Sequence, residues 1–245
     1  MNVVIQLFIY DWSKCKSEAE RLRKELRILE YGSVLLQNCA DPNIKKVHIL
    51  CESEEATDYY ESISAQFSHK TVFVNHGKQP TYQELMEYIK KTFTTKEIIC
   101  LMNADMFFNS GKDHELIQKH LGPTDLFALT RHEITDDGHK THTNETCPFT
   151  VHGGSCDTFI FYTPLLDTLD LSKMNFRQNL FGAEGVFMKV WVDAGYKLLN
   201  PCDEIITLHQ HQGRIHFETY ATIDTPENSV INYKTYLSNS SHKDT

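Results

Sequence analysis

A short polar segment follows the most apolar stretch of the chain. Residues 97–108 read EIICLMNADMFF, and the run Ile98–Met102 is typical of a strand buried on both faces. Asn103, Ala104 and Asp105 then interrupt the apolar pattern. Because ligands of open α/β sheets bind at the carboxyl ends of the strands, Asp105 is a candidate oxygen ligand for a divalent metal. A strand-end aspartate can also act only as a turn cap, and these residues alone leave both roles open.

Two histidines near residue 210 are candidate nitrogen ligands. His209 and His211 lie in the segment IITLHQHQ, which we predict to be a strand over 205–212. Alternation along a strand would place both rings on one face, about 7 Å apart. That separation is too long for two bonds to one ion without a bend. We therefore expect one of them to bind metal while the other supports it or contacts phosphate, with a structural pair as the alternative.

An acidic residue at the start of a predicted helix is a candidate base. Glu184 lies in the sequence FGAEG, and the helix is predicted from Gly182 to Ala194, with Gly195 ending it. A carboxylate at a helix N-terminus is stabilised as an anion by about 0.3–1 kcal/mol, which predicts an ionised Glu184. The neighbouring glycines leave room for a substrate. The same position also suits a carboxylate that only stabilises the helix.

The segments that must position these residues alternate between strands and helices in the first half of the chain. In the helix predicted over 17–38, one face is expected to be apolar and to pack on the core, with charged residues opposite; its residues are Leu22, Leu26, Leu29, Leu35 and Leu36. Thr81 and Glu84 are spaced as a capping box for the helix that ends near residue 93. Strands are predicted over 3–10, 44–51, 70–75 and 97–102. This order predicts an α/β fold, a three-layer α/β/α sandwich around a mostly parallel sheet.

The second half is more mixed. A helix is predicted over 113–121 and strands over 125–131, 155–162 and 198–201. Residues 132–152 are polar, contain four histidines and are predicted to form a hairpin or loop. We expect one domain over 1–221, in which the pattern changes after about residue 108, followed by a C-terminal tail over 222–245.

Composition limits the classes of partner. The chain has 245 residues and a formal net charge of −9, which argues against binding nucleic acid through bulk charge. The N-terminal residues resemble a strand and not a signal peptide, and no apolar run is long enough to span a membrane. The seven cysteines are scattered without a CxxC pair. Reduced thiols in a cytoplasmic protein are the expected state.

The order of these segments carries a family resemblance. The stretches are QPTYQELMEYI, IICLMNADMFF, LFALTRHE, GSCDTFIFY, LFGAEGVFMKVWVDAGYKLLNP and ITLHQHQ, from about Gln79 to Gln212. Together they resemble GT-A glycosyltransferases that use nucleotide sugars, particularly their small soluble viral and bacterial members. The resemblance implies a nucleoside-diphosphate sugar donor, with UDP favoured as the commonest donor nucleotide of this layout. It also implies Mn²⁺ or Mg²⁺ and a glycan or glycoconjugate acceptor. Within the domain over 1–221, it implies a nucleotide-binding half up to about residue 108 and an acceptor half from about 109.

The resemblance also assigns roles to individual residues. Asp105 would be the second acid of the family's DxD motif and a metal ligand together with His209, while Asn103 departs from the motif at the first acid. Histidine as a ligand favours Mn²⁺ over Mg²⁺. Glu184 would be the catalytic base, with Asp157 second. Residues implied to contact the donor are Phe8, Tyr10, Asp11, Glu52, Lys78, Tyr82, Asn103, Ala104, Asp105, Arg131 and His211.

The implied reaction is attack of an acceptor hydroxyl on the anomeric carbon. The metal neutralises the departing diphosphate, and one carboxylate takes the proton of the hydroxyl. A single base of this kind predicts inversion at the anomeric carbon.

Two alternatives remain open. A nucleotidyltransferase acting on sugar phosphates also uses metal at a sheet edge, but usually carries a glycine-rich basic loop after its first strand, which Asp11–Lys14 (DWSK) lacks. A non-catalytic sugar- or nucleotide-binding protein of the same fold is the other alternative, because of Asn103.

Overall fold

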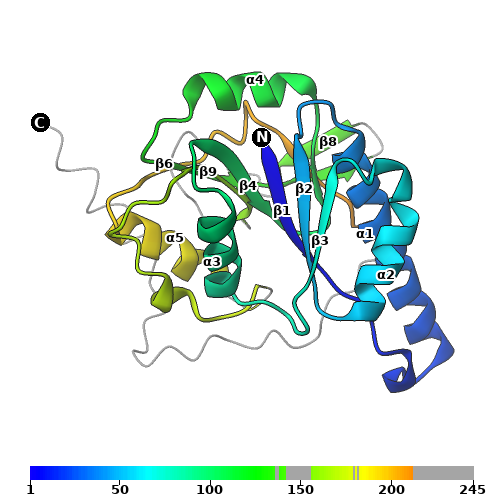
Figure 1. The fold of residues 1–245 in the computed structure, drawn as a ribbon. Coiled ribbons are helices and arrows are strands. Elements are labelled where there is room, and N and C mark those ends of the chain that lie inside the picture. Colours follow the sequence, from blue (N-terminus) through cyan, green and yellow to red (C-terminus); the bar gives the residue numbers. More distant parts are fainter. Residues whose placement is uncertain (136–137, 142–155, 179, 181, 212–245) are drawn as a thin grey trace, which may run out of the picture.

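A seven-stranded sheet forms the centre of the molecule (Figure 1). The computed structural model describes residues 1–135, 138–141, 156–178, 180 and 182–211. In sheet order the strands are β10 (Lys197–Leu199), β6 (Asp125–Thr130), β9 (Cys156–Thr163), β4 (Glu97–Met102), β1 (Asn2–Leu7), β2 (Lys46–Cys51) and β3 (Thr71–Asn75). Neighbours are parallel except that β9 is antiparallel to β4 and β6. The predicted α/β fold with a mostly parallel sheet is confirmed.

Helices cover both faces of this sheet. On one face, α3 (Tyr82–Thr92) and α5 (Ala183–Asp193) share a core with the strands; on the other face are α1 (Glu18–Ala40), α2 (Glu54–Ile63) and α4 (Gly111–His120). Short 3₁₀ helices are η1 (Trp12–Lys14), η2 (Ala65–Phe67) and η3 (Leu171–Met174). All six residues of β1 are buried, as expected for a strand between two helical layers. No helix in the described ranges is long and apolar enough to cross a membrane.

A second sheet lies beside the carboxyl end of β4. Its order is β5 (Met106–Phe108), β11 (Thr207–His209), β7 (His132–Thr135) and β8 (Gly138–Thr141). β7 and β8 form the hairpin predicted at the start of 132–152, while residues 142–152 and the predicted tail over 222–245 lie outside the described residues. In this sheet His209 pairs with Met106 on one side and with Glu133 on the other. Three distant segments therefore meet next to Asp105.

The predicted apolar face of α1 is buried only in the second half of the helix. Leu22, Leu26 and Leu29 are 56%, 46% and 59% exposed, whereas Leu35 is buried and Leu36 is half-buried. Figure 1 shows the first half of α1 extending past the end of the sheet, so the helix is anchored by its second half. The core side chains there are Ile28, Tyr31, Leu35 and Cys39. Arg27 and Glu30 are also buried on α1, although the leucine pattern placed them toward solvent.

The ends of α3 and α5 follow local sequence signals. The predicted capping box of Thr81 and Glu84 is present at the start of α3. Gly182 precedes α5 with φ +84° and Gly195 follows it with φ +97°, backbone conformations that favour glycine. These glycines fix where α5 begins and ends, and so where Glu184 lies.

Candidate active site

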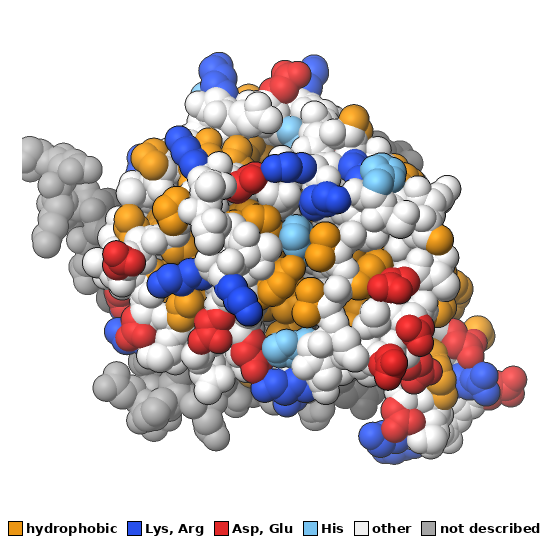
Figure 2. All heavy atoms as spheres, in the orientation of Figure 1, with side chains coloured by type: hydrophobic (Ala, Val, Ile, Leu, Met, Phe, Trp, Pro, Cys, Tyr) orange, Lys and Arg blue, Asp and Glu red, His pale blue; other side chains and the backbone are white. Residues whose placement is uncertain are grey.

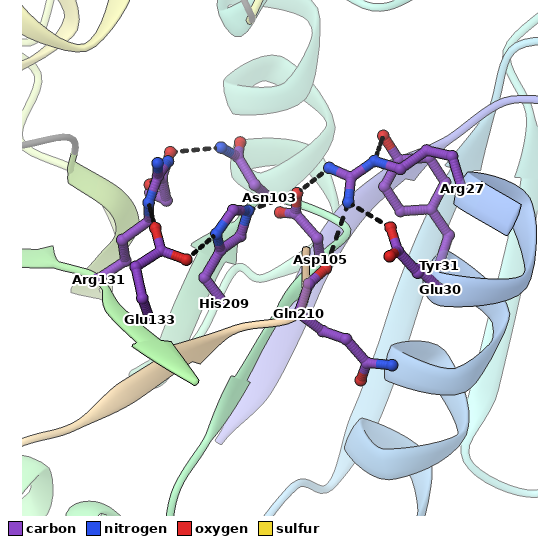
Figure 3. A network of polar contacts seen from close by, with 10 residues as sticks. Arg27, Glu30, Tyr31, Asn103, Asp105, Arg131, Glu133, His209 and Gln210 are labelled. Atoms are coloured by element: carbon purple, nitrogen blue, oxygen red, sulfur yellow. Dashed lines mark hydrogen bonds and ion pairs between the residues drawn. The ribbon is translucent and has the colours of Figure 1, made fainter. Parts of the chain in front are cut away.

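Asp105, His209 and Glu133 form a chain of contacts at the sheet edge (Figure 3). His209 Nε2 lies 3.0 Å from Asp105 Oδ2, and His209 Nδ1 lies 2.9 Å from Glu133 Oε2. Asp105 is in the turn between β4 and β5, His209 ends β11 and Glu133 is in β7. All three positions are fixed by backbone pairing in the small sheet. A histidine held by a carboxylate on one nitrogen and facing a second carboxylate with the other is a common arrangement of metal ligands.

A buried arginine shares the same aspartate. Arg27, from α1, makes an ion pair with Asp105 Oδ2. Its Nη1 donates to Glu30 Oε2 at 2.8 Å and to the carbonyl of Gln210 at 3.2 Å, and its Nε donates to the Tyr31 hydroxyl at 3.1 Å. Arg27 is 7% exposed. Figure 3 shows it reaching Asp105 from the side opposite His209.

The network continues to the second predicted carboxylate. Arg131 Nη1 donates to Asp157 Oδ2 at 2.9 Å, and its Nε donates to Glu133 Oε1 at 2.8 Å. Asn103 Nδ2 donates to Asp157 Oδ1 at 2.6 Å. Both oxygens of Asp157 therefore accept hydrogen bonds, which orients this carboxylate firmly. One connected set of polar groups runs from Asn103 to Arg27.

Electrostatics polarise the Asp105–His209 pair. Burial alone would raise the pKa of Asp105, but His209 and Arg27 hold that pKa well below its usual range. Burial alone would lower the pKa of His209, but hydrogen bonds to Asp105 and Glu133 raise that pKa to about 9. At neutral pH and without a metal ion, these shifts make the pair an aspartate anion facing a histidine cation. A bound metal would take the place of the histidine proton.

His211 supplies an observation that fits a metal ion. Burial, together with the charges of Arg27 and His209, lowers the pKa of His211 to about 4, so its imidazole is neutral. Its Nε2 is buried and has no hydrogen-bond partner among the described residues. Ligand atoms of Asp105, His209 and His211 all lie within 4.8 Å of one another. One carboxylate and two imidazoles form a suitable ligand set for Mn²⁺ or a similar divalent ion.

The predicted spacing of the two histidines is therefore wrong. β11 ends at His209, so His211 leaves the strand and their ring centroids are 5.2 Å apart. Both rings can approach one ion because of this bend.

Glu184 is the predicted base, and its environment differs from the expected one. Burial, together with the charge of Asp157, raises the pKa of Glu184 to about 7. A helix N-terminus stabilises an anion by about 0.3–1 kcal/mol, less than one pKa unit, so burial outweighs it here. The carboxyl group of Glu184 therefore keeps its proton to a higher pH than an exposed glutamate does, in contrast to the stabilised anion expected from the helix N-terminus. Within the described residues, no side chain makes a hydrogen bond with its carboxylate.

Residues predicted to contact the nucleotide base lie beyond β1 and β2. Phe8 packs against Tyr10 at 5.0 Å between ring centroids and against Tyr31 at 5.5 Å. The Tyr10 hydroxyl is buried without a hydrogen-bond partner in the described part of the chain. Glu52 is half-buried, which raises its pKa. Asp11 is exposed and caps η1 by accepting from the backbone N–H of Ser13.

Two residues predicted near the diphosphate have structural partners. Tyr82 is 1% exposed and stacks on Phe187 at 4.4 Å between ring centroids. It is a core residue beneath the site, because the N-terminus of α3 packs directly on α5. The exposed Lys78 pairs with Glu84 at 2.6 Å. Ala104 is half-buried between Asn103 and Asp105.

Sequence reasoning missed Arg27, Glu30 and the role of Glu133. Glu133 was assigned to a solvated polar segment, although it follows the strand ending in LFALTR. A signal for Arg27 was present in the spacing of Arg27, Tyr31, Val34 and Asn38, all buried at intervals of three or four residues.

Comparisons with known proteins agree at the level of fold. No family model and no curated protein sequence matches the chain. The structure is similar to the inositol-1-phosphate CTP transferase from T. maritima (10% identity, TM-score 0.51, 85% of this chain and 88% of that one). It is also similar to GalNAc-T7 solved with UDP, GalNAc and Mn²⁺ (13%, 0.51, 96% and 47%). A third similar structure is that of S. aureus TarS 1–349 in complex with UDP (14%, 0.50, 85% and 60%).

At these identities the likeness concerns the fold alone, and the chain spans about half the length of the GalNAc-T7 structure. What the chain shares with these structures is the arrangement of its strands and helices. The chain has a GT-A-like fold, a three-layer α/β/α sandwich around a mostly parallel sheet.

Proposed function

We propose that this protein is a metal-dependent glycosyltransferase that moves a sugar from a nucleoside-diphosphate sugar, preferably a UDP-sugar, to a hydroxyl of a glycan or glycoconjugate. The observation that carries this proposal is the meeting of Asp105 and His209 at the carboxyl edge of the sheet, with Glu133 behind the histidine. These residues come from separate segments and converge where α/β folds bind nucleotides.

Asp105, His209 and His211 would hold the divalent ion. Asp105 offers a hard oxygen and His211 an unpartnered nitrogen, while Glu133 fixes the ring of His209. When bound, the ion neutralises the charge that develops on the departing diphosphate. Asn103 is fixed by Asp157 in place of a first acid, so it fills a hydrogen-bonding role at the donor and leaves metal binding to Asp105.

Glu184 is proposed as the base that accepts the proton of the acceptor hydroxyl. A pKa of about 7 is well suited to a base operating at neutral pH. Asp157 is the weaker candidate because Asn103 and Arg131 engage both of its oxygens. Its proposed role is to orient Arg131 and to hold donor or acceptor hydroxyls. A single base on one side of the sugar supports inversion.

Phe8, Tyr10 and Glu52 are proposed to line the base and ribose site. They follow the carboxyl ends of β1 and β2, next to the network. The unpartnered Tyr10 hydroxyl is a candidate hydrogen-bond donor to the nucleotide. Asp11 and Lys78 would take part only by leaving the partners they have here, Ser13 and Glu84.

A nucleotidyltransferase acting on sugar phosphates is the second candidate, because the inositol-1-phosphate CTP transferase matches over 88% of its own length. Such an enzyme would release pyrophosphate from a nucleoside triphosphate. The segment after β1 is a 3₁₀ helix, Trp12–Lys14, with no glycine to cradle a triphosphate.

A binding and product assay separates these functions. We would measure the thermal stability of the protein with UDP, GDP, CTP and several nucleotide sugars, each with Mn²⁺ or EDTA, because ligands of the native state raise the melting temperature. Any stabilising nucleotide sugar would then be labelled in its sugar and followed for transfer or hydrolysis.

The expected result is Mn²⁺-dependent stabilisation by a nucleoside diphosphate and slow release of the labelled sugar. Asp105→Asn should abolish both effects. Asp167→Asn, an exposed aspartate beyond β9 at the opposite edge of the sheet, is the matched control. Pyrophosphate release from CTP and a sugar phosphate would favour the second candidate, and binding without turnover would indicate a binding protein.

A further inference from the structure

Arg27 is placed where it must affect any ion held by Asp105. Its guanidinium contacts Oδ2 of Asp105, the same oxygen that faces His209 Nε2. An ion bound between Asp105 and His209 would occupy the space that the hydrogen atoms of these contacts now fill. Because the guanidinium and the ion are both cations, they also repel each other at this short range.

Arg27 has other contacts that would hold its guanidinium in place without Asp105. Glu30, Tyr31 and the Gln210 carbonyl hold the guanidinium from the side of α1. If the contact with Asp105 is broken, these contacts still engage Nε and Nη1, and Nη2 is left to bind another acceptor at the site. An oxygen of a diphosphate can accept a charge-assisted hydrogen bond from Nη2.

The neighbouring groups make Arg27 more suitable for this role than the other nearby arginine. Arg131 is engaged by two carboxylates, Asp157 and Glu133, on the far side of His209. Among the described lysines and arginines, only Arg27 makes an ion pair with Asp105. It is also next to Tyr10 and Tyr31, close to the proposed nucleotide site.

We propose that Arg27 couples metal binding to donor binding: it neutralises Asp105 in the free protein, competes with the divalent ion for that carboxylate, and transfers to the donor diphosphate when ion and donor bind together. This inference rests on the proposed metal and donor site. Under this coupling, the protein binds the divalent ion weakly when no donor is present and tightly when the nucleotide binds with it. Such coupling avoids filling the site with an ion when no donor is present.

The test measures Mn²⁺ affinity directly, from the electron paramagnetic resonance signal of free Mn²⁺, with and without UDP. In the wild-type protein, UDP should tighten Mn²⁺ binding by about 5- to 150-fold, the usual range for coupled ligands. Arg27→Met should bind Mn²⁺ alone at least about fivefold more tightly than wild type. UDP should then tighten Mn²⁺ binding in this variant much less than in wild type.

Two further variants keep the result interpretable. Arg27→Met removes the ion pair between Arg27 and the buried Glu30. The double variant Arg27→Met/Glu30→Gln removes one charge of each sign and should give the same metal affinities if the single variant fails to fold. Arg23→Met removes an exposed positive charge from the same helix and should behave as wild type.

The outcomes separate this inference from the proposed function. Mn²⁺ binding that is unchanged or weaker in both Arg27 variants, while wild type binds Mn²⁺ with UDP, overturns the inference and leaves the metal site intact; Arg27 would then only orient Asp105. Absence of Mn²⁺ binding to wild type under every condition overturns the metal site itself, and the inference with it.

Discussion

At the scale of single residues, the site contains two carboxylates with opposite pKa shifts. Asp105 is buried among cations that keep its pKa low, whereas Glu184 is half-buried near the charge of Asp157, and its pKa rises to about 7. Pairs of acids that are separated in this way commonly divide the work of an active site between a permanent anion and a proton acceptor. This contrast supports the proposal that Asp105 binds the cation and that Glu184 accepts the proton.

Glu184→Gln should reduce sugar transfer by about 10²- to 10⁴-fold, the contribution of a general base. Because only the ionised carboxylate accepts a proton, the kcat of the wild-type protein should rise with pH through about 7 and then level off. Rates from pH 5.5 to 8.5, with Mn²⁺-dependent UDP binding as the control, check both points. Near-normal turnover of the variant would move the role to Asp157.

The same substitution should stabilise the fold. The folded state of the protein binds the Glu184 proton more tightly than the unfolded state, whose pKa is near 4.5. Ionisation of Glu184 therefore lowers the free energy of unfolding as the pH rises from about 4.5 through 7. Glu184→Gln should raise the melting temperature at pH 8 and have little effect at pH 4. A lower melting temperature at pH 8 would contradict the burial argument.

Glu133 is expected to act through His209 and not on the substrate. Its carboxylate accepts from His209 Nδ1 and so directs Nε2 toward Asp105. Glu133→Gln should weaken Mn²⁺ binding by about 10- to 100-fold, as other removals of such supporting carboxylates do. The electron paramagnetic resonance titration measures this directly, and saturating Mn²⁺ should restore most of the transfer rate. A loss of rate that Mn²⁺ does not restore would place Glu133 in another role.

At the scale of elements, the two glycines that bound α5 allow a matched experiment. Gly182 and Gly195 both have positive φ, and an added Cβ would meet no atom within 4 Å at either position. Substitution by alanine at each should therefore cost a similar amount, about 1–2 kcal/mol of backbone strain. Gly182→Ala alone should also reduce transfer, because Gly182 sets the position of Glu184. Equal loss of activity in both variants would show that the effect is only on stability.

The elements also show why part of the site was predictable from sequence. Asp105 was found because a buried strand ends at Met102, and His209 because it alternates along a late strand; these are local signals. Arg27 was missed because the exposed leucines of α1 gave the helix a false apolar face. Where α1 crosses the edge of the sheet depends on packing of the whole chain, which its own periodicity does not encode.

Glu133 and the bend at His211 were missed for a related reason. The pairing of β7 with β11 joins segments that are about seventy residues apart in sequence, as the contact between Glu133 and His209 shows. A regular strand over residues 205–212 would separate His209 and His211 by about 7 Å. In the structure β11 ends at His209, so this spacing does not apply. Such ends are set by tertiary contacts and not by local propensity.

At the scale of the whole molecule, net charge determines how the donor can be bound. The chain carries a net charge of −9, and Figure 2 shows acidic side chains gathered over α2, which begins with Glu54 and Glu55. Within the described part of the chain, the arginines of the polar network, Arg27 and Arg131, are already paired with carboxylates. A nucleoside diphosphate that approaches without metal therefore meets little uncompensated positive charge.

UDP should consequently bind at least about tenfold more weakly in EDTA than in Mn²⁺, because the ion supplies the charge that the protein lacks and about 1.4 kcal/mol corresponds to that factor. Calorimetry at physiological ionic strength measures the difference. If the overall negative charge repels the nucleotide, raising the salt concentration in EDTA should leave the weak affinity unchanged or improve it, since salt screens the repulsion. Local attraction by arginines would instead weaken with salt. Equal affinities with and without Mn²⁺ would remove the ion from the donor site. An affinity in EDTA that weakens as salt is added would assign that task to Arg27 and Arg131.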